Sequence, residues 1–288
     1  MQIVKLQFIG GGKMAEALLG GLIECDWAQA TELHVVEPLT PRRNVLAEQH
    51  HNISVGTKPL KGVDAVLAVK PDVVASVLPA LAYVQVRRVL SIAAGVPTET
   101  IENQLPAGVA VVRAMPNTCA LVGQGAAAVA KGAAAGTADL DWAAGILGAV
   151  GTVEVVDETD LNAVTGLSGS GPAYVFLLAE ALTAAGVAEG LSPQVAASLT
   201  RQTLLGAATL LTDSEADPAL LRANVTSPGG TTEAGLAVFN EADFAGMVAA
   251  AVQAATERSR ELGTPAGVNT TSPTVAQAAT ARSFELGG

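Results

Sequence analysis

A regular alternation of short β-branched segments with helix-like segments, through residues 1–157, limits the folds open to this chain more than any other feature. Residues 3–9 alternate apolar and polar side chains before a glycine, and residues 13–23 carry apolar side chains at three- and four-residue spacings, as in an amphipathic helix. Strict strand and helix alternation is typical of an α/β fold with a doubly wound parallel sheet. Further strands are predicted at residues 33–36, 53–55, 63–69, 89–93, 109–113, 126–130 and 152–156.

After residue 157 the pattern changes to long Ala- and Leu-rich stretches, at residues 174–187, 194–211 and 244–262. Two segments rich in glycine, serine and proline, residues 168–172 and 227–230, are predicted to break these helices. Several stretches are apolar around most of the helix circumference, which indicates burial on more than one side. The second part is therefore predicted to be all-helical and to dimerise through its helices, with a buried central helix as the alternative.

These patterns divide the chain into a first domain over residues 1–157, a helical domain over residues 158–262 and a segment over residues 263–288. The last segment is rich in Thr, Ser, Pro and Gly, a composition typical of a flexible tail.

The charge distribution excludes nucleic acid as a partner, because phosphate binding needs a basic face and the net charge is −11. Before residue 151 the chain carries 11 basic and 12 acidic residues, and after residue 150 it carries 5 basic and 15 acidic residues. An anionic ligand is therefore more favourable on the first half, although on charge alone a solvated acidic surface is the preferred explanation of the asymmetry.

The cysteine content and the hydrophobic pattern predict a cytoplasmic protein without a membrane partner. Cys25 and Cys119 lie far apart, and no cationic leader with an apolar core begins at Met1, so neither a disulfide framework nor secretion is indicated. No stretch approaches the roughly 18 uninterrupted apolar residues of a membrane span.

Residues 10–15, GGGKMA, fit the pattern G-x-G-x-x-A between a strand and a helix, where a dinucleotide is bound. Gly10 allows the tight turn, Gly12 leaves room for the pyrophosphate, and Ala15 allows close helix packing. The phosphates would then lie on the helix N-terminus, whose unpaired N–H groups and dipole favour negative charge. A flexible glycine turn is the simpler alternative. Lys13 is expected either near the phosphates or in solvent.

The residues after the second strand leave the choice between NAD and NADP open. Glu37 is placed to bind the ribose hydroxyls of NAD and would repel a 2′-phosphate. Arg42 and Arg43 follow in the next helical turn, where their guanidinium groups could hold that phosphate. Pro71 ends the fourth strand at the carboxyl edge of the sheet, and Lys70 beside it faces either the cofactor or water.

The reaction chemistry is limited by the absence of proton donors from the helical half. The histidines are His34, His50 and His51, and the last lysine is Lys131. Reduction of a carbonyl usually needs such a donor, whereas a protonated imine is already an electrophile and is neutralised by hydride. No metal site is predicted.

Residues 224–232, NVTSPGGTT, run into a helix predicted over residues 233–239 and offer N–H groups and hydroxyls without bulky side chains. A helix N-terminus of this composition favours a small carboxylate. A plain N-cap is the alternative, but it needs only one hydroxyl.

Six segments stand in the order known from one protein family: FIGGGKMA at 8–15, AVKP at 68–71, SIAAGV at 91–96, RAMPNT at 113–118, TGLSGSGPAY at 165–174 and NVTSPGGTT at 224–232. Through these segments the chain resembles the pyrroline-5-carboxylate reductase family, to about Leu262. This resemblance implies a Rossmann-like domain, a helical domain that dimerises by interleaving, and often a ring of dimers. It also implies reduction of 1-pyrroline-5-carboxylate, a cyclic imino acid, to L-proline by NADPH or NADH.

The resemblance also implies roles for single residues. It implies that the floor of the cofactor site is formed by Gly10, Gly12, Met14, Ala68, Val69, Lys70, Pro71, Ala93, Ala94 and Gly95. It also implies that the wall beside the nicotinamide is formed by Met115, Pro116 and Asn117. The substrate carboxylate is implied at Ser227, Gly230 and Thr231, and the catalytic hydroxyl near the ring nitrogen at Thr232. A helix-capping hydroxyl is the alternative for Thr232. Many relatives carry Asn in place of Lys13.

Two other functions compete with this one. A 3-hydroxyacid dehydrogenase of similar layout would use a lysine soon after a G-S-G turn, but residues 169–171 are followed by Pro172, Ala173 and Tyr174, and no lysine comes later. A non-catalytic nucleotide-binding protein would leave residues 224–232 without a purpose.

Overall fold

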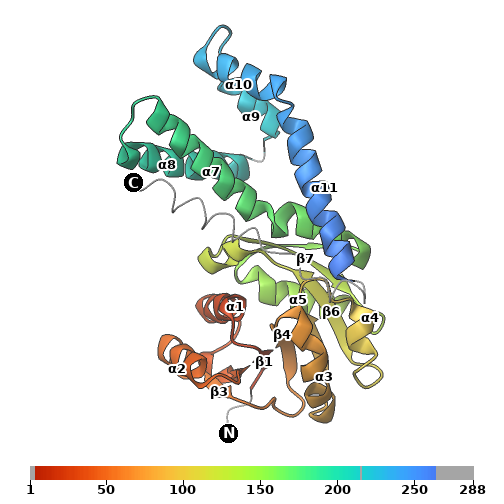
Figure 1. The fold of residues 1–288 in the computed structure, drawn as a ribbon. Helices are drawn as coiled ribbons and strands as arrows, with labels where there is room; N and C mark the ends of the chain where they lie inside the picture. The colour runs from red at the N-terminus through yellow and green to blue at the C-terminus, as the bar shows by residue number, and fades with distance from the viewer. Residues whose placement is uncertain (1–3, 215, 264–288) are drawn as a thin grey trace, which may run out of the picture.

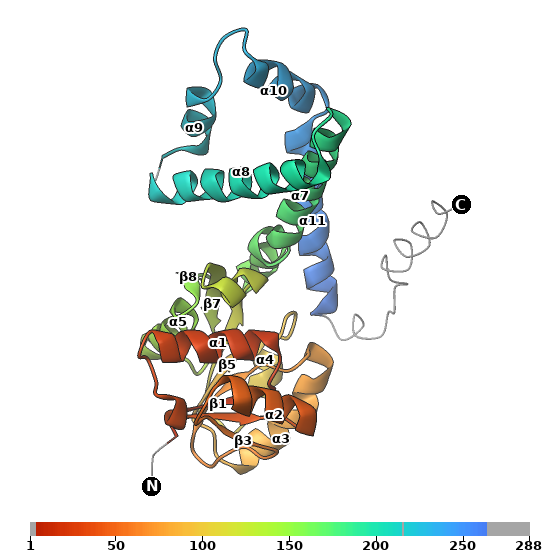
Figure 2. The ribbon, with the colours of Figure 1, turned by 90° about the vertical axis from the view of Figure 1, so that its left-hand side faces the viewer.

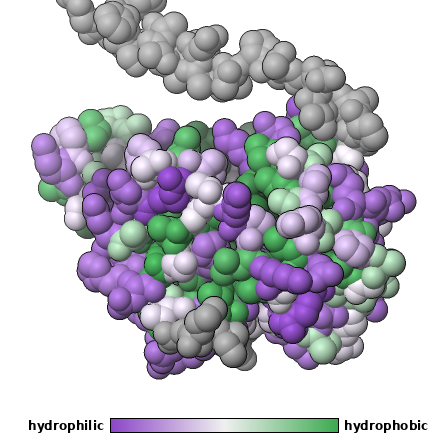
Figure 3. All heavy atoms as spheres, turned by 90° about the horizontal axis from the view of Figure 1, so that it is seen from below, coloured by the Kyte–Doolittle hydropathy of each residue, from purple (hydrophilic) through white to green (hydrophobic). Residues whose placement is uncertain are grey.

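The computed structural model describes residues 4–214 and 216–263. A sheet domain lies at the base of the molecule, and helices project from it as two arms (Figures 1 and 2). Seen from below, the sheet domain presents hydrophilic residues around smaller hydrophobic areas (Figure 3). The segment predicted as a tail lies, apart from Gly263, outside the described residues.

Within the described residues the sheet has eight strands in the order β3-β2-β1-β4-β5-β6-β7-β8. Because β1 lies between β2 and β4, the strand order reverses there, and ligands of such sheets bind at the carboxyl ends beside the reversal. The strands are β1 (Leu6–Ile9), β2 (Leu33–Val36), β3 (Ser54–Gly56), β4 (Asp64–Leu67), β5 (Arg88–Ser91), β6 (Ala110–Met115), β7 (Gly125–Lys131) and β8 (Gly151–Val155).

Helices cover both faces of the sheet and bury its apolar side chains. On α1 the buried residues Ala15, Leu18, Leu19 and Leu22 form one stripe, as their spacing requires. This stripe belongs to the same core as buried residues of α2 and α5, whereas α3 and α4 pack on a second core. These helices are α1 (Lys13–Glu24), α2 (Thr40–Gln49), α3 (Val74–Tyr83), α4 (Thr98–Glu102) and α5 (Thr137–Gly148).

The sequence pattern predicts a parallel sheet, but one pair of strands differs. Strand β7 runs antiparallel to β6, with Met115 opposite Ala128. Only the short helical turn Thr118–Val122 connects these strands. A parallel return needs a crossover of a dozen or more residues, so this connection can only reverse the chain. The longer helix α5 then returns the chain to β8, which pairs in parallel with β7.

The predicted helix break at residues 168–172 is wrong. The chain forms one helix from Glu158 to Ala188, which contains α6 (Leu161–Val164), the π-helical turn η5 (Thr165–Gly169) and α7 (Gly171–Ala188). The Ser170 N–H donates to the Thr165 carbonyl over 2.8 Å, so the glycines widen the helix by one residue instead of ending it. Pro172 lies in the first turn of α7, where proline is tolerated.

The long helix and its neighbour α8 (Pro193–Asp213) expose large apolar side chains. Among the described residues, Glu158–Ala188 is one helix of membrane-spanning length and hydropathy, with 6% of its most apolar window buried. Phe176 and Leu177 on α7, and Leu205 and Leu210 on α8, are each more than 60% exposed. So large an apolar surface needs a covering partner.

The remaining helices complete the two arms. They are α8 (Pro193–Asp213), α9 (Pro218–Asn224), α10 (Thr231–Glu241) and α11 (Phe244–Leu262). Helices α7 and α8 pack against each other, while α11 runs from the distal end of the molecule back to η5 and the sheet domain (Figures 1 and 2).

We expect the stability of the fold to fall in mild acid through His34 on β2. Burial lowers the pKa of His34 below its ordinary value of 6.5, against a smaller opposite effect of the Lys58 carbonyl. As the pH falls below 6.5, the unfolded chain therefore binds a proton that the folded chain resists, and stability is lost down to the folded-state pKa. Above 6.5 the contribution is complete.

Chemical denaturation of the wild type and of His34→Gln at about pH 7.5 and about pH 5.5 checks this expectation. The amide of glutamine has a donor group and an acceptor group, which can replace the contacts of His34 with the Lys58 carbonyl and the Ser54 hydroxyl, but it does not titrate. The variant should lose less stability between the two pH values than the wild type. Equal losses would contradict the assignment.

Candidate active site

The turn from β1 to α1 is shaped by glycine at two positions for different reasons. Gly10 has a φ of +101°, and a Cβ there would lie 2.7 Å from the Ala68 carbonyl oxygen at the end of β4. At Gly12 a Cβ would meet nothing within 4 Å, and no side chain caps α1. The space above the first turn of α1 is therefore open and its N–H groups are available, which fits the pyrophosphate of a dinucleotide.

The Glu37 carboxylate at the end of β2 holds this turn from the side. It is buried, with Oε2 accepting the Gly11 N–H over 3.0 Å and Oε1 accepting the Leu39 N–H over 2.9 Å. Both oxygens thus join the β1–α1 turn to the β2–α2 loop. The sequence pattern pointed only to the ribose hydroxyls and not to these two backbone donors.

The two arginines that follow Glu37 have separate partners. The Arg42 Nε donates to the Gly11 carbonyl over 2.5 Å, and its guanidinium pairs with Glu16 over 2.6 Å. Arg43 donates to the carbonyls of Glu37 and Pro38 and so stabilises the loop. Arg42 therefore lies directly beside the glycine turn.

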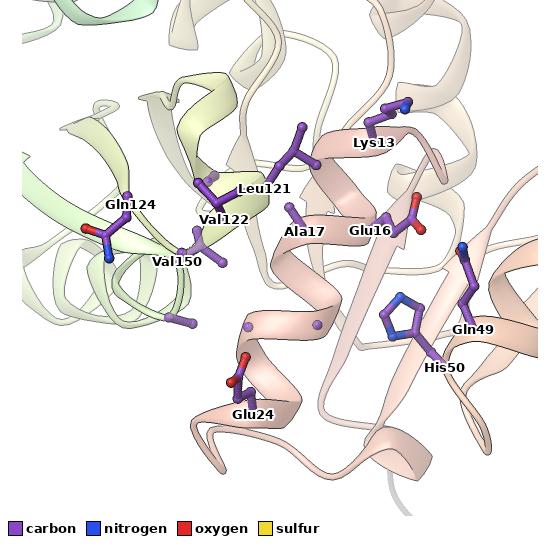
Figure 4. A pocket seen from close by; sticks show the side chains of 15 residues that line it. Lys13, Glu16, Ala17, Glu24, Gln49, His50, Leu121, Val122, Gln124 and Val150 are labelled. Carbon is purple, nitrogen blue, oxygen red and sulfur yellow. The ribbon is translucent and has the colours of Figure 1, made fainter. Parts of the chain in front are cut away.

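Lys13 is exposed and lines a cavity of about 710 Å³ that runs along α1 (Figure 4). Glu16, Glu24 and His50 also line it, and the buried Nε2 of His50 has no partner among the described residues. Of the predicted site residues only Lys13 contributes to this cavity.

Three further predicted segments lie with the glycine turn at the carboxyl ends of neighbouring strands. Residues 68–71 follow β4, residues 93–95 follow β5, and residues 115–117 end β6 and follow it. Gly95 has a φ of +75°, and a Cβ there would lie 3.4 Å from the Leu262 Cβ at the end of α11. The sheet thus brings the predicted cofactor segments to one edge.

Asn117 uses both ends of its buried amide within the protein. Its Oδ1 accepts the N–H groups of Cys119 and Ala126, each over 3.2 Å, and its Nδ2 donates to the Ser168 carbonyl over 3.0 Å. Next to it, a Cβ on Gly169 would lie 2.5 Å from the Met115 Cε. The π-helical turn η5 therefore packs directly on the wall predicted beside the nicotinamide.

A second contact at this junction was missed by the sequence analysis. The Glu158 carboxylate accepts the N–H and the hydroxyl of Thr98, over 2.8 and 2.6 Å, and pairs with Arg113 over 3.1 Å. These partners are 45 and 60 residues away along the chain, so no local pattern reveals them. Glu158 fixes the start of the helical arm to the edge of the sheet that carries the cofactor segments.

The loop before α10 has the form of an anion site. The Gly230 N–H donates to the Ser227 carbonyl over 3.0 Å, and a Cβ on Gly230 would collide with the Ser227 hydroxyl. In the described part of the chain, the N–H groups of Thr231, Thr232 and Glu233 have no hydrogen-bond partner. Three unpaired donors thus point out of the first turn of α10.

This loop does not meet the cofactor segments within one chain. The connection between α9 and α10 lies at the distal end of the arms, whereas the glycine turn before α1 lies in the sheet domain at the other end (Figures 1 and 2). The residues predicted for the substrate and those predicted for the cofactor therefore form two separate halves. Residues 4–214 and 216–263 contain no cluster of three His, Cys, Asp or Glu suited to a metal ion.

We expect substitutions of Gly12 and Gly10 to have opposite consequences. Gly12→Ala places a methyl group in open space, so folding should be unchanged while dinucleotide affinity falls about tenfold or more. Gly10→Ala forces a positive φ and a contact with Ala68, which should cost roughly 1–3 kcal/mol of stability. Thermal unfolding and dinucleotide titration followed by fluorescence measure both. Equal melting temperatures for the two variants would contradict this assignment.

Comparison with known protein families gives two matches. Residues 158–262 match the family described as pyrroline-5-carboxylate reductase dimerisation, and residues 5–95 match the family described as NADP oxidoreductase, coenzyme F420-dependent. The first range begins at Glu158, and the second contains the glycine turn. The helical arms therefore match a dimerisation domain, and the cofactor edge matches an NADP-dependent domain.

Whole-chain relatives agree with these matches. Pyrroline-5-carboxylate reductase from Synechocystis is 44% identical over 264 residues, covering 90% of this chain and 98% of the relative, and that from Pseudomonas aeruginosa is 41% identical over 268 residues, covering 91% and 98%. The structure of a pyrroline-5-carboxylate reductase from Coxiella burnetii matches with a TM-score of 0.86 and 34% identity, over 91% of this chain and 100% of that one. The Plasmodium falciparum enzyme, solved with NADP bound, matches with a TM-score of 0.79 and 30% identity, over 92% and 100%. On this evidence the chain belongs to the pyrroline-5-carboxylate reductase family.

Proposed function

We propose that this chain reduces 1-pyrroline-5-carboxylate to L-proline with NADPH or NADH, the last step of proline biosynthesis. The observation that carries this conclusion is the loop before α10, which presents three unpaired N–H groups to a small carboxylate. Such a loop has a purpose in a family whose members act on a cyclic imino acid. A helical half without lysine or histidine also fits a substrate that carries its own proton.

The dinucleotide fits the edge built by Gly10 and Gly12, and when bound it supplies a hydride. The first turn of α1 would hold the pyrophosphate, and residues 68–71 and 93–95 would form the floor under the rest of the molecule. Met115 and Pro116 would form the wall beside the nicotinamide. Asn117 would hold that wall in place, because its amide is already bonded to Ser168, Cys119 and Ala126.

Arg42 bears on the choice of coenzyme. Its guanidinium now pairs with Glu16, and Gly11, whose carbonyl accepts from Arg42, also donates its N–H to the buried Glu37 carboxylate, which would repel a 2′-phosphate. Binding of NADPH would therefore require Arg42 to exchange Glu16 for the phosphate. NADH requires no such exchange, and we propose that the protein accepts both coenzymes.

The substrate carboxylate would lie on the N–H groups of Thr231 and Thr232 and beside the Ser227 hydroxyl. The Gly230 N–H would not bind the carboxylate, because it already donates to the Ser227 carbonyl. Gly230 is needed because a side chain there would collide with the Ser227 hydroxyl. The Thr232 hydroxyl would orient the ring nitrogen. The protein thus contributes position more than acid–base groups, and orientation supplies most of the rate enhancement.

We infer that each active site forms between two copies of the chain. The substrate loop and the cofactor edge lie at opposite ends of one protomer, so one copy's loop has to cover the other copy's edge. The exposed apolar faces of α7 and α8 supply the surface that would hold the two copies together. The match to a dimerisation family over residues 158–262 supports a homo-oligomer.

Three further points belong to the same proposal. The domains are residues 1–157 and residues 158–262, with the junction at Glu158. The dimers assemble into a ring, as the resemblance to the family implies. The protein is cytoplasmic, which the free thiols of Cys25 and Cys119 support.

The reaction is tested with the purified protein, pyrroline-5-carboxylate and each coenzyme in parallel, with a 3-hydroxy acid and the oxidised coenzymes as the control. We expect proline formation with coenzyme oxidation and no turnover of the hydroxy acid, because the helical half lacks a catalytic lysine.

Thr232→Ala should lower kcat about tenfold without abolishing it, because the protein contributes position more than acid–base groups. Unchanged kcat and KM in this variant would remove Thr232 from the mechanism.

The shared site predicts rescue between two inactive variants. Gly12→Val disables the cofactor half and Gly230→Val disables the substrate loop, so each variant alone should be inactive. In a mixed dimer one of the two sites combines two intact halves, and random mixing should restore about a quarter of the wild-type activity. The test is activity after co-expression or co-refolding of the two variants. A site built within one protomer would give no recovery.

A further inference from the structure

The carboxylate of Glu233, the third residue of α10, lies within the proposed substrate site but has no role in the proposed function. Its Oε2 accepts the Gly229 N–H over 2.7 Å, so its carboxylate folds back over the start of its own helix. The unpaired N–H groups of Thr231 and Thr232 belong to the same helical turn. A substrate carboxylate bound there lies within about one turn, roughly 5 Å, of a second negative charge.

This second charge matters because the substrate exists in two charge states. With a protonated ring nitrogen 1-pyrroline-5-carboxylate is a zwitterion, and without that proton it is an anion. A carboxylate near the site favours the zwitterion, since it attracts the N–H⁺ group and repels the net negative form. Only the zwitterion has the electrophilic C=N⁺ bond that accepts hydride.

Other charges near this loop do not neutralise Glu233. The flanking elements carry Arg222 on α9 and Glu241 at the end of α10, and Asp217 and Asp243 directly precede α9 and α11. Among the described residues none of these forms an ion pair with Glu233 within 4.0 Å. The charged residues at the far end of α11, residues 257–261, lie toward the sheet domain (Figure 1). Acidic residues thus outnumber the single arginine around the loop.

We propose that Glu233 keeps the bound imine protonated, by placing a fixed negative charge beside the ring nitrogen and so raising the pKa of the bound substrate. The proposal rests on the proposed function and assigns to this chain an electrostatic residue next to Thr232. Its carboxylate stabilises the form that reacts, and the N–H⁺ bond becomes the N–H of proline when hydride adds to carbon. No proton has to come from a lysine or histidine.

Glu233→Gln tests this role with little structural change, because the glutamine Oε1 can still accept the Gly229 N–H while the charge is removed. Glu241→Gln is the matched control, since it removes the same charge from the other end of the same exposed helix. The pH dependence of kcat at saturating substrate reports ionisation in the bound complex. We expect its alkaline limb to shift down by about one pH unit, a tenfold change in the ionisation ratio, in Glu233→Gln only.

A binding measurement without turnover provides the second readout. L-proline and tetrahydrofuran-2-carboxylate share the ring and the carboxylate, but only proline carries a positive ring nitrogen. Calorimetric titration of both ligands with NADP⁺ present should show that Glu233→Gln lowers the preference for proline by about tenfold, as proline binds less tightly and the oxygen analogue more tightly. Glu241→Gln should keep the wild-type preference.

The outcomes separate this inference from the proposed function. Wild-type protein that makes proline, together with a Glu233→Gln variant of unchanged pH profile and unchanged ligand preference, would overturn the role of Glu233 alone. Wild-type protein that makes no proline and binds neither ligand would overturn the proposed function. Loss of kcat at every pH with an unshifted alkaline limb would assign Glu233 to loop structure and also overturn the inference.

Discussion

Unpaired backbone N–H groups at the first turns of α1 and α10 are the feature on which the rest of this structure depends. Gly12 leaves the first turn of α1 open, because a Cβ there would meet nothing within 4 Å. Gly230 has no side chain, which allows Ser227 to lie close to the first turn of α10. Each turn favours an anion, a pyrophosphate in one case and a small carboxylate in the other. In the proposed function, the sheet, the helical arms and the dimer bring these two turns to the same substrate.

The junction between the domains determines where the second turn can go. Glu158, the first residue of the long helix, binds Thr98 and Arg113. Asn117, directly after β6, donates to the carbonyl of Ser168 in the π-helical turn. These contacts lie directly beside the cofactor segments. A movement of the helical arm is therefore coupled to the edge proposed to hold the dinucleotide, and in the proposed dimer the partner's loop would be positioned through the same contacts.

The exposed apolar faces of the arms are explained by the same geometry. Side chains such as Phe176 and Leu177 would be unfavourable in water on a monomer, but in the proposed dimer they would provide the surface that a second copy covers. The helix that carries them could also span a membrane by length and hydropathy. The dimerisation match over the same residues gives the simpler account. With the water displaced by the partner, the charge of Glu233 would act on the substrate more strongly than in solvent.

The sequence by itself determined the local features of this protein: the tight turn at Gly10, the amphipathic α1, the helical arms and the glycine-rich loop before α10. Each depends on neighbouring residues or on a short period, so it can be predicted without the fold. Only the tertiary structure decided the antiparallel direction of β7, the continuity of the helix through Ser170, and the commitment of Glu37 to the backbone of Gly11. It also separated α10 from the sheet domain of its own chain, which carries the cofactor edge (Figure 1). The bond between Glu37 and Gly11 and the distance between the two halves of the site join or separate residues far apart in the sequence, where a local pattern carries no information. The direction of β7 depends on the length of its connection, and the continuity of the helix depends on the backbone bond from Ser170 to Thr165, neither of which the residue types alone reveal.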